Sequence, residues 1–135
     1  MFKKALSASL ALVLVFSMAT FSFSGGGKKA KVKTISGTLV DLKCYAAMGV
    51  KTNDHGDMKN CGSMCAQGGL PLGIVDAKGN VYNLAVPSPA YAKYVGKELR
   101  LTGTYGKFAN LFMPKEMEVK ENGKWVKKKL PKTMM

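Results

Sequence analysis

The chain contains 135 residues, of which 47% are hydrophobic, and this length is that of one domain of ordinary size. Its 21 Lys and Arg and 8 Asp and Glu give a formal net charge of +13, which excludes a compact acidic protein. A positive balance favours contact with polyanions such as nucleic acid, anionic lipid headgroups or cell-wall polymers. The 15 Gly and 5 Pro follow no period and only three cysteines are present, which excludes a collagen-like chain and a disulfide-rich scaffold.

The N-terminal segment predicts export. Two lysines precede an uncharged, mostly apolar run over residues 5–21, and small residues follow it. This is the pattern of a secretory signal peptide over residues 1–24, cleaved after Ser24 or, as a second option, after Ala19. An uncleaved membrane anchor is the alternative, because about 17 apolar residues approach the ~20 that span a bilayer. No later segment is long and apolar enough for a span, so we expect a periplasmic or secreted protein.

Residues 25–33 are rich in Gly and Lys and predict a flexible basic tether, followed by a single domain over residues 34–130. Gly37 lies inside the first apolar segment of that domain, where it predicts a bulge or a tight bend. Turn-forming residues at 77–80 and at 122–123 predict two hairpins. Segments rich in β-branched and alternating apolar residues predict strands over 32–42, 72–76, 81–86, 97–105, 111–119 and 124–128.

A short helix is predicted between the third and fourth strands, with Ser88 as its cap, Pro89 at its first position and Gly96 as its stop. We therefore predict a mainly β fold, a small OB-like barrel of five to six strands with a helical insertion over residues 43–71 after the first strand. Another small barrel and a β-sandwich are the alternatives. We expect the helix over 88–95 to close one end of the barrel. The predicted core consists of Val32, Ile35, Leu39, Ile74, Val81, Leu84, Leu99 and Leu101.

The insertion over residues 43–71 holds all three cysteines and the only histidine of the chain. Asp57 predicts the cap of a helix over residues 58–67, closed by one of the two glycines that follow. Cys61 and Cys65 are four residues apart and are expected to share one face of that helix.

Four residues of the insertion predict a metal site. Cys44 is expected at the end of the first strand and His55 in the loop before the helix, where both can meet Cys61 and Cys65. Three thiolates and an imidazole form a tetrahedral ligand set for Zn²⁺, and the soft sulfur atoms suit Cu(I) equally well. The nearby thioethers that favour copper belong to Met48, Met58 and Met64.

Other interpretations of the insertion remain open. An oxidising compartment favours a disulfide from Cys44 to Cys61 or Cys65, which leaves one odd thiol, and thiol redox activity is a third possibility. A single histidine in a polar loop is also typical of an exposed surface residue. The sequence contains neither a Ser-His-Asp set nor a glycine-rich nucleotide motif, so we predict no catalytic residues and do not expect an enzyme.

Lysines cluster at residues 28–33 and 124–132, where they form either a solvated surface or a site for an anionic polymer. Export removes most nucleic acid from reach, so no specific nucleic-acid partner is expected.

Several motifs carry a resemblance to a known group of proteins. They are SGTLVDLKCYAAMG, a histidine followed by C-x-x-x-C, GGLPLGIVD, VY-x-L and VGKELRLTG. Over about residues 35–105 the chain resembles a group of small uncharacterised exported bacterial proteins, OB-like, with a V-D-x-x-C-Y strand and an H…C-x-x-x-C helix. The resemblance implies the fold and the cysteine cluster. The gap between His55 and Cys61 is wider in this chain than the corresponding gap in the group.

Two functional hypotheses follow. The first is an exported protein whose cluster of Cys44, His55, Cys61 and Cys65 binds or shuttles a soft metal ion, Cu or Zn, or serves as a thiol site with a redox partner protein. The second is a non-enzymatic basic module that binds an anionic polymer or a partner protein, with the cysteines in a structural disulfide.

Overall fold

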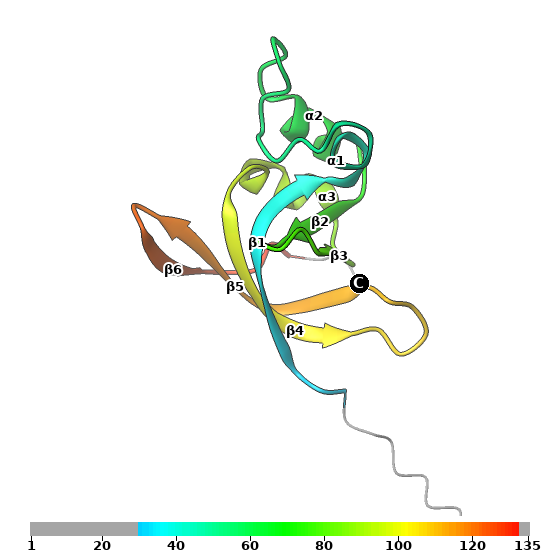
Figure 1. Cartoon of the computed structure of the whole chain (residues 1–135). Helices are drawn as coiled ribbons and strands as arrows, with labels where there is room; N and C mark the ends of the chain where they lie inside the picture. Colours follow the sequence, from blue (N-terminus) through cyan, green and yellow to red (C-terminus); the bar gives the residue numbers. More distant parts are fainter. Residues whose placement is uncertain (1–29, 133–135) are drawn as a thin grey trace, which may run out of the picture.

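The computed structural model describes residues 30–132 (Figure 1). The predicted signal peptide over residues 1–24 and most of the predicted tether over 25–33 lie outside the described residues, so both stay predictions. Within the described part of the chain, no helix combines the length and the apolar character that crossing a membrane requires.

The described residues form one six-stranded antiparallel sheet in the order β3-β2-β1-β4-β5-β6 (Figure 1). Each of the six segments expected as a strand contains one, although the segment predicted over 81–86 is a strand only over Val81–Asn83, and the mainly β prediction is confirmed. The strands are β1 (Lys33–Asp41), β2 (Leu72–Val75), β3 (Val81–Asn83), β4 (Glu98–Tyr105), β5 (Phe112–Glu121) and β6 (Lys124–Lys128).

Strand β1 joins the two halves of the sheet. Its residues 33–38 pair with β4, and its residues 38–41 pair with β2. Gly37 lies where the two pairings meet, and a Cβ atom there would overlap the carbonyl oxygen of Val75. The glycine is therefore needed for the close approach of two backbones. Figure 1 shows β1 as a long curved strand that ends beside the helices.

The ladder of the sheet does not close on itself. A single parallel bridge between Leu84 and Phe112 connects the chain after β3 to the start of β5. There the backbone N–H of Ala85 donates to the carbonyl oxygen of Phe112 at 2.9 Å. The fold is thus a six-stranded antiparallel sheet with short helices, and the OB-like barrel stays a prediction.

Three short α-helices and one 3-10 helix cover an end of the sheet: α1 (Leu42–Met48), α2 (Cys61–Gln67), α3 (Ser88–Tyr91) and η1 (Ala92–Tyr94). Helix α1 was not among the predicted elements. The helix predicted over 58–67 begins only at Cys61, so the assignment of Asp57 as its cap is wrong. Ser88 is also not a cap, because it is the first residue of α3 and Pro87 precedes it in the capping position.

The core lies between the sheet and the helices. Six of the eight predicted core residues are buried, but Val32 and Val81 are 58% and 44% exposed. Val32 precedes β1, and Val81 belongs to the edge strand β3, so neither side chain has a second layer against it. Helices α3 and η1 add Tyr91, Ala92 and Tyr94 to the core, which places them against the sheet as a cover.

The close approach at Gly37 gives a stability prediction. We expect Gly37→Ala to lower the free energy of unfolding, because the added methyl group would press on rigid backbone. The expected loss is roughly 3 kcal/mol, the upper end of the usual cost of overpacking. Urea denaturation measures the change. Gly68→Ala is the control, since Gly68 has φ −72° and an added Cβ would find its nearest atom at 3.4 Å. Equal stability of the two variants would contradict the prediction.

Candidate metal centre

Asp41 ends β1 and starts α1. Its Oδ1 accepts a hydrogen bond from the backbone N–H of Cys44 at 2.8 Å, which caps the helix. Gly49 ends the helix with φ 69°, and its N–H donates to the carbonyl oxygen of Tyr45 at 2.8 Å. Cys44 therefore lies in the first turn of α1, three residues beyond the strand end where the sequence placed it, and it is buried.

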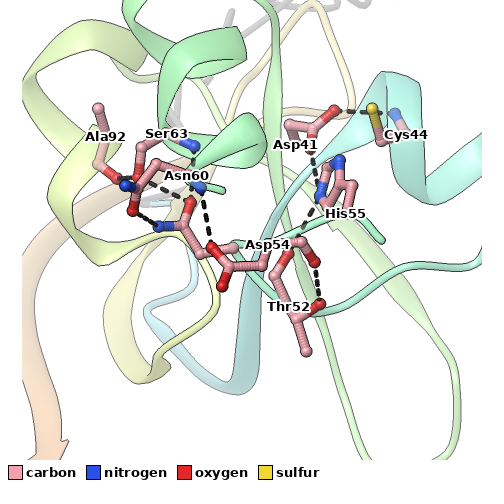
Figure 2. Close-up of polar contacts among 9 residues, drawn as sticks. Asp41, Cys44, Thr52, Asp54, His55, Asn60, Ser63 and Ala92 are labelled. Atoms are coloured by element: carbon pink, nitrogen blue, oxygen red, sulfur yellow. Dashed lines mark hydrogen bonds and ion pairs between the residues drawn. The ribbon is translucent and has the colours of Figure 1, made fainter. Parts of the chain in front are cut away.

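His55 lies in a tight turn. His55 and Met58 exchange two backbone hydrogen bonds of 3.0 and 3.1 Å around Gly56, whose φ is +58°. The turn directs the histidine inward, and the residue is only 5% exposed, so the interpretation of His55 as an exposed surface residue is wrong. Figure 2 shows its ring beside Asp41 and Thr52.

The two nitrogens of the His55 ring have different surroundings. Nε2 lies 3.1 Å from the carbonyl oxygen of Thr52 and 3.6 Å from Oδ2 of Asp41 (Figure 2). Nδ1 is buried, and within the described residues it has no hydrogen-bond partner. With Nε2–H donating to these oxygens, the lone pair of Nδ1 is available to a ligand.

Asn53 fixes helix α2 to the loop that carries His55. The backbone carbonyl of Asn53 accepts from Gly62 N–H at 2.9 Å, and its Oδ1 accepts from Ser63 N–H at 2.7 Å. The Ser63 hydroxyl lies 2.8 Å from that Oδ1 and 2.9 Å from the carbonyl oxygen of Ala92 in η1, so it can donate to either (Figure 2). These contacts place the cysteines of α2 at a defined position beside the histidine.

The four predicted ligands come together around Cys44. The Sγ atoms of Cys44 and Cys61 and a ring nitrogen of His55 lie within 4.8 Å of one another. The Sγ atoms of Cys44 and Cys65 and a carboxylate oxygen of Asp41 form a second such group. Tetrahedral ligation with bonds of about 2.3 Å separates sulfur atoms by ~3.8 Å, so each group is compact enough for a metal ion, but neither of the two groups contains all four predicted ligands. All three cysteines are free within residues 30–132, and the predicted disulfide is not formed there.

The surroundings of Cys44 favour its protonated form. Burial, and then the hydrogen bond and charge of Asp41, raise the pKa of the Cys44 thiol to about 11. Burial and the neighbouring Cys65 also raise the pKa of Cys61. Because the thiolate is the reactive form, these shifts disfavour a redox-active thiol at neutral pH. A metal ion would have to displace the protons in order to bind.

Asp41 is the residue of the site that the sequence interpretation missed. It caps α1, faces His55 and raises the pKa of Cys44, yet its carboxylate is 1% exposed. The sequence does hold a signal for it, since an aspartate three residues before Cys44 and a glycine at position 49 delimit a short capped helix.

The α2 side of the site opens to solvent through a hollow of about 480 Å³. The hollow is lined by Met58, Lys59, Cys61, Met64 and Cys65. Cys61 and Cys65 are therefore accessible from outside, whereas Cys44 and His55 lie buried behind them.

Comparison with known proteins provides no family assignment. No protein-family model matches the chain, and no curated protein or solved structure matches it. The resemblance to exported OB-like bacterial proteins stays a prediction, and function is inferred from the geometry around Cys44 and His55.

The raised pKa of Cys44 gives a second prediction. In a Cys61→Ser/Cys65→Ser variant, the alkylation rate of Cys44 should keep rising about tenfold per pH unit through pH 10, because only the thiolate reacts. Adding Asp41→Asn should increase the rate at pH 9, since the neutral amide still caps α1 but removes a charge that raises the pKa. Iodoacetamide labelling followed by mass spectrometry measures both rates.

Asp57→Asn is the matched control, because Asp57 is an exposed carboxylate of the same insertion. A rate that levels off near pH 8.5, the pKa of an ordinary cysteine, would contradict the assignment.

Proposed function

We propose that the protein binds one soft metal ion, Cu(I) or Zn²⁺, through Cys44, His55, Cys61 and Cys65. The observation that carries the proposal is the buried Nδ1 of His55, which has no partner among the described residues. Leaving a buried polar atom without a partner costs about 1–3 kcal/mol. A bound metal ion would satisfy that nitrogen.

The contacts of the ring support metal binding by Nδ1. Metal-binding histidines commonly donate their other N–H to a carboxylate or a backbone carbonyl, which orients the ring. In His55 the other nitrogen faces both kinds of oxygen, the Thr52 carbonyl at 3.1 Å and the Asp41 carboxylate at 3.6 Å. The three sulfur atoms then supply the soft ligands that select Cu(I) or Zn²⁺.

We also propose that the chain is exported and that its sheet belongs to an OB-like barrel. Export rests on the pattern of residues 1–24. The barrel proposal is supported by the strand order and by the parallel bridge between Leu84 and Phe112. This bridge connects the chain just after β3 to the start of β5, and β3 and β5 are the two outer strands of the five-strand series β3-β2-β1-β4-β5.

A basic binding module is the second candidate function. The net charge of +13 favours it, because an anionic polymer or an acidic partner protein would be attracted to this surface. In that function the cysteines would form a structural disulfide and would leave a single free thiol.

Metal stoichiometry separates the two functions. We expect the anaerobically purified chain to bind one Cu(I) or Zn²⁺ ion, measured by elemental analysis after gel filtration. Cys44→Ser should abolish binding because Cys44 belongs to both groups of candidate ligands. Cys61→Ser should also abolish metal uptake and leave the sheet folded, as judged by circular dichroism.

Met113→Leu is the control, since it changes an exposed sulfur-containing side chain in β5. Absence of metal together with one titratable thiol per chain would exclude the metal site and support the binding module.

A further inference from the structure

Two methionines next to the cysteines are exposed to solvent. Met58 and Met64 line the same hollow as Cys61 and Cys65, and they are 59% and 65% exposed. Methionine is an apolar side chain that usually fills gaps in a core. Neither side chain belongs to the core cluster of this fold, so core packing does not explain them.

The backbone holds both thioethers beside the cysteines. Met58 closes the turn that buries His55, through the two hydrogen bonds between these residues. Met64 precedes Cys65 in helix α2 and lies three residues after Cys61, at the spacing of helical neighbours. The same two elements that deliver inner ligands to the site therefore display thioethers at its mouth.

The chemistry of this mouth is selective. Thioethers bind Cu(I), whereas Zn²⁺ sites use thiolates, imidazoles and carboxylates. No carboxylate is among the residues that line the hollow in the described part of the chain. Its one charged side chain, Lys59, pairs with Asp54 at 3.0 Å, so the positive charge at the mouth is partly compensated.

We infer that Met58 and Met64 form an outer Cu(I) site that receives the ion and passes it to the cysteines. The inference rests on the proposed function, and of the two metals proposed there it selects Cu(I). In the transfer, the bonds from Cu(I) to the two thioethers break as bonds to the sulfurs of Cys61 and Cys65 form. Each thiol that binds releases its proton to water. Copper stays Cu(I) throughout, so no electron acceptor is required.

Transfer kinetics test the inference. The chain is mixed under nitrogen with Cu(I) bicinchoninate, and loss of the colour of the chelate is followed by stopped flow. Met58→Leu/Met64→Leu keeps the volume and apolar character of both side chains but removes both sulfur atoms. We expect the variant to take up Cu(I) about tenfold more slowly, with an equilibrium affinity within about twofold of the unchanged chain. Met113→Leu is the matched control and should transfer at the normal rate, since Met113 lies in β5 and is also exposed.

A parallel experiment with Zn²⁺, delivered from a zinc-binding dye, distinguishes binding of Cu(I) by the thioethers from a general effect on entry of ions into the hollow. Slower Cu(I) uptake with unchanged Zn²⁺ uptake supports the outer site. Equal slowing of both ions overturns it, because the substitutions would then act on the shape of the hollow. An unchanged Cu(I) rate also overturns it but leaves the proposed function intact. Failure of the unchanged chain to bind either ion overturns the proposed function itself.

Discussion

The carboxylate of Asp41 is the interaction on which the site depends. It lies at the last position of β1, is 1% exposed, and contacts two of the candidate ligands, Cys44 and His55, directly. One oxygen caps α1 at the N–H of Cys44, and the other faces His55. A buried carboxylate is costly unless it is paired or hydrogen-bonded, so these contacts are a condition for folding as well as for ligand geometry. The strand end, the first turn of α1 and the histidine loop are thereby stabilised together.

The remaining ligands depend on contacts that are distant in sequence. The loop between α1 and α2 has little regular structure, and Asn53 joins it to the start of α2. A Cβ at Gly62 would meet Val95 at 2.7 Å, and one at Gly96 would meet the backbone of Asn53 at the same distance. At Gly62 the neighbour is a side-chain methyl group of Val95, and at Gly96 it is a backbone nitrogen, so the loop, α2 and the segment after η1 pack closely at positions that need glycine. The candidate ligands come from α1, the loop and α2, so their relative positions depend on tertiary packing.

The sequence predicted the sheet better than the insertion, for physical reasons. Strand positions follow from alternation and hairpin turns, which are local, and the spacing of Cys61 and Cys65 follows from helix periodicity, which is also local. His55 is buried against Asp41, fourteen positions away in the sequence, and a contact between such distant residues leaves no local pattern. The cap at Asp57 failed for a related reason. Helix α2 begins after Asn60, and the N–H of Asn60 donates to Oδ1 of Asp54 at 2.8 Å, a contact across six positions that the capping rule does not describe.

The site is graded from outside to inside. Exposed thioethers of Met58 and Met64 lie at its mouth, partly exposed thiols of Cys61 and Cys65 lie below them, and the buried Cys44 and His55 lie deepest. Burial strengthens each metal–ligand interaction, and it also raises the pKa of the Cys44 thiol to about 11. In the proposed transfer, an ion entering from the mouth would first meet thioethers that need no deprotonation, and its own positive charge would then favour loss of the thiol protons farther in. Under this proposal, an open surface would load a buried site in which burial keeps the Cys44 thiol protonated until the ion arrives.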